Sequence, residues 1–219
     1  MIRLAIFDCD GTLVDSQHNI CRAVEEAFGA ARLEPPPRNA IRRIVGLSLV
    51  EAMRILLPDA DPAQHLLLAD DYKAAFFRLR SSGAMAEEPL YEGIVDALDA
   101  LAATGWRFGV ATGKSDRGLT HILAHHRIAD RFVTLQTADR HPSKPHPSMI
   151  ELAMAEAGAL PAGTVMIGDT SYDMAMARAA GVHAVGVAWG YHPADELIDA
   201  GAHIVIDQVD ALPAALEAR

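Results

Sequence analysis

Two aspartates separated by one residue follow the first hydrophobic run of the chain. The run, Ile2-Arg3-Leu4-Ala5-Ile6-Phe7, leads directly into Asp8-Cys9-Asp10-Gly11-Thr12. Alternate side chains of an extended chain point the same way, so Asp8 and Asp10 are expected to face one site. Asp8 can attack phosphorus as a carboxylate nucleophile, and Asp10 can protonate the leaving oxygen and later deprotonate the attacking water. The spacing therefore predicts phosphoryl-transfer chemistry through an aspartyl-phosphate.

More polar residues stand where other hydrophobic runs end. Thr112 ends one run, Asp169 ends another, Asp173 comes four residues later, and Lys144 lies in a proline-rich loop. Mg²⁺ prefers oxygen ligands and keeps several waters, so two or three carboxylates suffice to hold it. We expect Asp8 and Asp169 to bind Mg²⁺ directly and Asp173 to bind it directly or through water.

The same residues could hold the phosphoryl group of a substrate. Carboxylates repel an anionic phosphate, and the metal ion together with Lys144 would offset this repulsion. The Thr112 hydroxyl can donate to a phosphoryl oxygen, as can the backbone amides near Gly11 and Gly113. A single Asp after a strand is often a helix cap, and a single Lys is usually solvated. It is the combination that favours Mg²⁺ and a phosphoryl group.

Strands and helices alternate in the second half of the chain, and this pattern must position the polar residues. The alternation predicts an α/β fold with a doubly wound, parallel sheet of buried strands. Ligands bind such sheets at the carboxyl ends of the strands, where the acidic residues fall. The expected strands are 2–7, 106–111, 132–137, 164–167, 183–188 and 203–206, and the expected helices are 93–103, 147–157, 172–180 and 194–200.

A block of helices interrupts this pattern after the first strand. Helical periodicity runs from Ile20 to Ala31, and two amphipathic stretches follow near 40–57 and 62–80, with proline-rich breaks between them. Gly11 permits the turn that leads the chain into this block. The predicted domains are a Rossmann-like core of residues 1–14 and 86–219 and an α-helical cap of residues 15–85.

The net charge and the composition of the chain restrict the kinds of molecule that it is expected to bind. A net charge of −10 over 219 residues argues against a nucleic-acid surface, and three lysines provide no polybasic membrane patch. No apolar run is long enough to cross a bilayer, and the N-terminus lacks a signal peptide. Two cysteines make no disulfide framework, and Cys9 is expected to pack as a small apolar side chain. We expect a cytoplasmic monomer or homodimer that binds neither nucleic acid nor membranes.

The polar residues also occur in a familiar order along nearly the whole chain. The segment Asp8-Cys9-Asp10-Gly11-Thr12, then Thr112, Lys144 and Gly168-Asp169-Thr170-Ser171-Tyr172-Asp173, resembles the four motifs of the haloacid dehalogenase-like hydrolase superfamily. The resemblance implies a Rossmann-like core with an α-helical cap inserted after the first strand. It also implies a role for each residue. Asp8 is the nucleophile and a Mg²⁺ ligand, and Asp10 is the acid/base and binds the metal through its backbone carbonyl. Thr112 and Lys144 bind the phosphoryl group, Asp169 binds Mg²⁺, and Asp173 supports that ion.

A C-terminal segment indicates which branch of the superfamily the chain resembles. Residues 187–197, Val-Ala-Trp-Gly-Tyr-His-Pro-Ala-Asp-Glu-Leu, followed by Ala200-Gly201-Ala202, are similar to the phosphoglycolate phosphatase-like branch. This similarity implies a phosphatase that acts on a small phosphorylated metabolite, with phosphoglycolate favoured.

The predicted cap is expected to close over the site and exclude water. The resemblance places a specificity loop near the turn at residues 45–48, so Gly46, Leu47 and Ser48 are expected to approach the leaving group. Arg42 and Arg43, just before this turn, could bind a substrate carboxylate as a bidentate fork. The alternative is that both arginines are solvated on a helix face.

Two other functions remain open at this stage. A sugar phosphomutase of the same fold shares all four motifs and differs only in the acceptor of the phosphoryl group. A phospho-acceptor signalling domain also gathers acidic residues, a Thr and a Lys around Mg²⁺ on a doubly wound sheet. Such domains are shorter, lack the helical insert, and are phosphorylated on a later strand.

Overall fold

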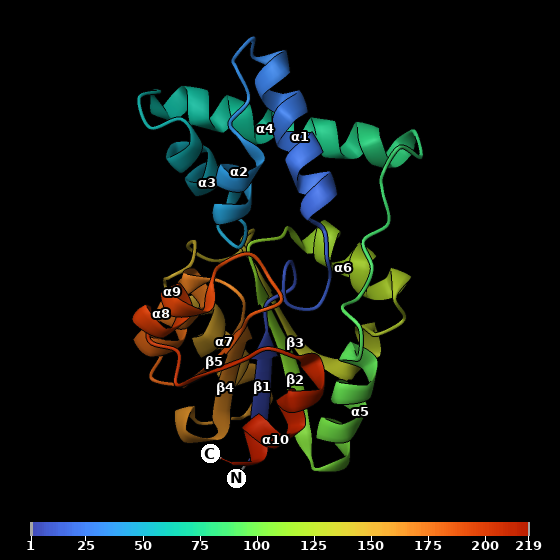
Figure 1. Ribbon diagram of the computed structural model, residues 1–219, viewed down its shortest axis with the longest axis vertical. Helices are drawn as coiled ribbons and strands as arrows, with labels where there is room; N and C mark the ends of the chain where they lie inside the picture. The colour runs from blue at the N-terminus through green and yellow to red at the C-terminus, as the bar shows by residue number, and fades with distance from the viewer. Residues whose placement is uncertain (1, 219) are drawn as a thin grey trace.

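Six parallel strands run through the centre of the protein in the order β3-β2-β1-β4-β5-β6 (Figure 1). The computed structural model describes residues 2–218. The predicted doubly wound sheet is confirmed, with β1 between β2 and β4. The strands are β1 (Arg3–Phe7), β2 (Trp106–Thr112), β3 (Phe132–Thr137), β4 (Thr164–Gly168), β5 (His183–Val187) and β6 (Ile204–Ile206).

Helices cover both faces of the sheet, and each face has its own apolar core. Ala5 and Phe7 pack into the core under α5 (Ile94–Ala103), α6 (Asp116–His125) and α10 (Leu212–Glu217). Leu4 and Ile6 point the other way, into the core under α7 (Ser148–Ala157), α8 (Ser171–Ala179) and α9 (Ala194–Asp199). This two-residue alternation is what a strand buried on both faces requires. No helix in residues 2–218 combines the length and the apolar character needed to cross a membrane.

Four further helices form a layer over the carboxyl end of the sheet (Figure 1). They are α1 (Gln17–Ala30), α2 (Arg38–Arg43), α3 (Leu49–Leu56) and α4 (Pro62–Ser81). Their own core contains Phe28, Ile41, Met53 and Leu68, all almost fully buried. The chain enters and leaves this layer through paired segments, because Val14 forms an antiparallel bridge with Leu90. The two crossings therefore lie side by side.

The structure differs from the sequence-based expectation in three elements. The stretch near 40–57 is two helices, α2 and α3, because Gly46 adopts a left-handed conformation with φ of 96° between them. Helices α6 and α10 were not expected. Helix α10 is short and buries only Leu212 and Leu216, so its periodic signal is weak. Helix α6 buries Leu119, Ile122 and Leu123, a helical spacing that is present in the sequence but was not recognised.

The turn between α2 and α3 descends onto the loop that follows β2. A Cβ atom at Gly113 would lie 2.4 Å from the Leu47 carbonyl oxygen and 2.5 Å from that of Gly46. No side chain fits between two backbones this close. The contact fixes the helical layer against the edge of the sheet.

We expect Gly113→Ala to destabilise the protein, because the new methyl group collides with backbone atoms that cannot move independently. Overpacking of this kind costs about 1–3 kcal/mol. Gly29→Ala is the matched control: a Cβ there has no neighbour within 4 Å, and the exchange should be neutral or stabilising by about 0.5–1 kcal/mol. Urea unfolding measures both, and equal stability of the two variants would contradict the close approach.

Candidate active site

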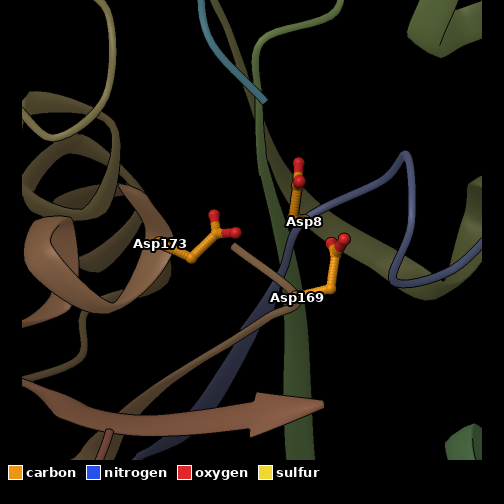
Figure 2. Close-up of side chains that lie close together, drawn as sticks. All are labelled: Asp8, Asp169 and Asp173. Atoms are coloured by element: carbon orange, nitrogen blue, oxygen red, sulfur yellow. The ribbon is translucent and has the colours of Figure 1, made fainter. Parts of the chain in front are cut away.

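Three carboxylates that are far apart in the sequence meet at the carboxyl end of the sheet. Asp8 follows β1, Asp169 follows the adjacent strand β4, and Asp173 lies in the first turn of α8. One oxygen from each lies within 4.8 Å of the others, and all three residues are fully buried. Figure 2 shows the three side chains projecting into one region. The structure brings together the side chains of three of the four residues assigned to metal binding; the fourth, Asp10, was assigned through its backbone carbonyl.

Lys144 enters this cluster from the loop before α7. Its Nζ lies 2.9 Å from Asp8 Oδ1 and 2.7 Å from Asp173 Oδ1, and the residue is only 1% exposed. Burial opposes its charged form, but the attraction of Asp173 and Asp8 outweighs this and raises the pKa of Lys144 above its ordinary value. Lys144 is therefore a fixed positive charge beside Asp8.

Local structure fixes the orientation of Asp173. Its Oδ2 accepts the Thr170 hydroxyl at 2.6 Å and the Thr170 backbone N–H at 3.1 Å, which forms a capping box at the start of α8. The cap occupies Oδ2 and turns Oδ1 toward Lys144. The helix-cap interpretation and the site interpretation of this residue are thus compatible.

Asp169 is enclosed by backbone and hydrogen-bond donors. Its Oδ1 accepts the Thr12 hydroxyl at 2.8 Å, and its Oδ2 accepts the Tyr191 N–H at 2.9 Å. A Cβ at Gly11 or at Gly190 would lie 2.2 Å from atoms of Asp169, so only glycine fits at these two positions. The carboxylate is held in place by residues from two separate loops, one after β1 and one after β5.

The cluster carries more negative charge than its protein partners neutralise. Burial raises the pKa of Asp8 to about 7, with Lys144 opposing the shift and Asp173 adding to it. Burial also raises the pKa of Asp169 well above its usual value, and repulsion from Asp8 and Asp173 adds to this effect. Within residues 2–218, Asp8 Oδ2 has no hydrogen-bond partner. Three convergent hard oxygen donors with an unpartnered atom fit a divalent cation such as Mg²⁺.

Asp10 lies outside the three-carboxylate cluster. Strand β1 ends at Phe7, and the chain turns back at once, with the Leu13 N–H donating to the Cys9 carbonyl at 2.9 Å. Cys9 packs into the same core as Phe7, as the alternation requires. The Asp10 carboxylate accepts the Ser16 hydroxyl and lies 2.8 Å from Lys114 Nζ.

Lys114 is a site residue that sequence reasoning missed. Its side chain is only 12% exposed, although a single lysine is expected to be solvated. Its position in the sequence could have identified it as a site residue, because it follows Thr112 and Gly113 directly after β2. Burial opposes the charged form of Lys114, but Asp10 outweighs this and raises the pKa of the ammonium. Thr112 is fully buried at the same edge, with its Oγ1 accepting the Lys114 N–H at 3.2 Å.

The turn between α2 and α3 closes the top of the site. A Cβ at Gly46 would lie 3.8 Å from Asp8 Oδ2 and 3.5 Å from Thr170 Oγ1. Leu47 is buried, and the Ser48 N–H donates to Ser143 Oγ at 2.9 Å, one residue before Lys144. The structure thus places the predicted specificity turn directly above Asp8.

The two arginines before this turn lie on the surface, and Arg43 is paired with a carboxylate of the protein itself. Both are exposed, and Arg43 Nη1 and Nη2 each donate to one oxygen of Glu196 at 2.6 Å. The Arg43 carbonyl also accepts the Tyr172 hydroxyl at 3.2 Å. Arg43 therefore connects the helical layer to α8 and α9 of the other part of the chain.

Comparison with known proteins agrees with this geometry. A family model described as haloacid dehalogenase-like hydrolase matches residues 5–187. A probable phosphatase, IndB, of Dickeya dadantii is 34% identical over 98% of this chain and 94% of the relative. A phosphoglycolate phosphatase of Photobacterium profundum is 27% identical over 96% and 94%. The crystal structure of a predicted phosphatase from Clostridium acetobutylicum superposes with a TM-score of 0.89, at 25% identity over the full length of both chains.

We expect Mg²⁺ to raise the melting temperature of the protein, because a ligand that binds only the folded state stabilises it. At a concentration one hundred times Kd the gain is about 2.7 kcal/mol. Asp169→Asn should abolish this Mg²⁺-dependent shift. Asp70→Asn, at a side chain that is 73% exposed on α4, should retain it. A shift of equal size in both variants would place the ion elsewhere.

Proposed function

The chain belongs to the haloacid dehalogenase-like hydrolase family and is a phosphatase, and from this premise we propose its substrate and mechanism. We propose that it hydrolyses a small phosphorylated metabolite through an aspartyl-phosphate on Asp8, with Mg²⁺ as cofactor. A phosphoglycolate-like ester is the favoured substrate. The main observation in support is the buried Asp8 carboxylate, which has one unpartnered oxygen and an ammonium at 2.9 Å.

The first step transfers the phosphoryl group to the protein. An Asp8 oxygen forms a bond to phosphorus while the bond from phosphorus to the ester oxygen breaks, and Asp10 gives its proton to that oxygen. Lys144, together with the Thr112 hydroxyl and the Gly113 N–H, holds the phosphoryl oxygens. Asp8, Asp169 and Asp173 would hold Mg²⁺, which supplies positive charge against the phosphoryl oxygens when bound.

The second step returns the site to its starting state. Asp10, now a carboxylate, takes a proton from water, and the water oxygen attacks the phosphorus of the aspartyl-phosphate. The bond between phosphorus and Asp8 breaks, which regenerates the Asp8 carboxylate and releases inorganic phosphate. Asp10 ends with the proton that the next ester needs. A mutase would instead pass the phosphoryl group to a second hydroxyl of the substrate.

The choice of a small ester rests on the enclosure of the site and on the relatives. Gly46 and Leu47 cover Asp8, which leaves little room for a large leaving group while the turn is in place. A phosphoglycolate phosphatase is among the relatives that match nearly the whole chain. We propose that residues 15–85 act as a cap that opens to admit the ester and closes to exclude water.

Asp8→Asn should abolish turnover, because an amide oxygen cannot act as the nucleophile. The expected loss is about 10⁴-fold or more in kcat. Asp10→Asn should lower kcat by about 10²–10⁴-fold, since it removes only the proton transfer. Phosphate release from a panel of phosphoglycolate, pyrophosphate, nucleotides and hexose phosphates measures both, with melting curves to verify folding. Phosphate release by Asp8→Asn at the wild-type rate would contradict the mechanism.

A second experiment addresses Arg43. The guanidinium of Arg43 is bound by Glu196. We therefore expect Arg43→Ala and Glu196→Ala to change KM equally for phosphate esters with a carboxylate and for phosphate esters without one. Loss of an exposed ion pair of this kind changes an equilibrium by about fivefold at most. Arg54→Ala, which removes an exposed pair with Glu51 within α3, is the control. A rise in KM found only in Arg43→Ala and only for carboxylated esters would instead support direct substrate binding.

A further inference from the structure

Lys114 is a buried charge that the phosphoryl-transfer residues described above do not include. It follows β2, whereas Ser16, the other residue in contact with Asp10 described above, lies just before α1. Its Nζ is 2.8 Å from Asp10 Oδ1, and the two side chains are 12% and 9% exposed. The pair is shielded from solvent, so its geometry is much better defined than that of an exposed ion pair.

Both contacts to the Asp10 carboxylate end on the same oxygen. Ser16 Oγ donates to Oδ1, and Lys114 Nζ lies against Oδ1. A carboxylate anchored at one oxygen by two donors cannot rotate freely about its terminal bond. Oδ2 is therefore the oxygen left to carry a proton to the ester and to take one from water.

The charges of Lys114 and Asp10 also act on two other buried groups. Burial raises the pKa of Tyr72, on α4, and of Glu88, in the segment between α4 and α5; Lys114 opposes each shift and Asp10 adds to it. The Glu88 carbonyl contacts His126 Nε2 at 2.8 Å, and Glu88 Oε1 has no hydrogen-bond partner within residues 2–218.

Stability alone gives a weak reason for this pair. A buried ion pair often contributes no more than an apolar replacement of the same size, because both charges lose their hydration. Orientation of a reacting group is different, since a displacement of about 1 Å can cost about 10²-fold in rate. The placement of Lys114 therefore suits control of the Asp10 geometry.

We propose that Lys114 is a positioning residue, which holds Asp10 Oδ1 so that Oδ2 faces the oxygen of the leaving group. The proposal rests on the proposed function, because it assumes that Asp10 is the acid/base of a phosphatase. In the step affected, the bond between phosphorus and the ester oxygen breaks while the proton on Asp10 Oδ2 moves to that oxygen. Lys114 does not touch the substrate and exchanges no proton.

The dependence on the leaving group tests this role. An alcohol such as glycolate leaves as an unstable alkoxide unless it is protonated, so its departure depends on a well-placed Asp10. p-Nitrophenolate is a stable anion and leaves without a proton. Lys114→Met should therefore lower the rate of glycolate release from phosphoglycolate by about 10²-fold, but lower p-nitrophenol release from p-nitrophenyl phosphate by no more than about threefold.

Single-turnover measurements, with enzyme in excess and Mg²⁺ present, isolate this step from the later attack of water. Lys114→Arg, which keeps a cation, should recover most of the glycolate rate. Lys73→Met removes the same charge from an exposed position on α4, where the side chain is 61% exposed, and should behave as wild type. Lys114→Gln serves as the second variant if melting curves show that Lys114→Met does not fold.

The possible outcomes distinguish the positioning role of Lys114 from the proposed phosphatase function. Selective loss of glycolate release supports the positioning role. Equal slowing with both esters, or no slowing with either, would overturn it while leaving a working phosphatase. A wild-type protein that releases phosphate from none of the esters would refute the proposed function itself.

Discussion

The mutual repulsion of three buried carboxylates governs the structure around the carboxyl edge of the sheet. Oxygens of Asp8, Asp169 and Asp173 lie within 4.8 Å of one another, and all three residues are fully buried. Such a cluster is unfavourable unless cations and donors are supplied, and Lys144 supplies one buried positive charge. The remaining excess of negative charge would favour the binding of a hard divalent ion, as we propose.

The need to enclose these carboxylates accounts for the close approach of backbone segments to Asp169 and to the loop after β2. Gly11 and Gly190 leave room for the Asp169 carboxylate, and Gly113 lets the turn at Gly46 descend onto the β2 loop. Each approach depends on a missing side chain, so the loops and the turn at Gly46 pack closely around the carboxylates. Close enclosure by protein lowers the local dielectric and strengthens the charge interactions within the site.

The two buried lysines divide the site into two sides. Lys144 lies against Asp8 and Asp173. Lys114 lies against Asp10. In the mechanism we propose, this separation would let Asp8 act as the nucleophile while Asp10, two residues later, transfers protons.

The sequence alone determined the doubly wound sheet, because burial of the strands on both faces leaves a strong apolar pattern. It also determined the order of polar residues at the strand ends, because the carboxyl ends of parallel strands share one edge of the sheet. It indicated Asp8, Thr112, Asp169 and Asp173 for the same reason. Lys144, in a proline-rich loop, was indicated by its positive charge in combination with these residues and by the family resemblance. Only the tertiary structure decided which lysine pairs with which aspartate, that Arg43 is bound by Glu196, and that the stretch near 40–57 is interrupted at Gly46. Those outcomes depend on contacts between distant segments, and local periodicity carries no information about such contacts.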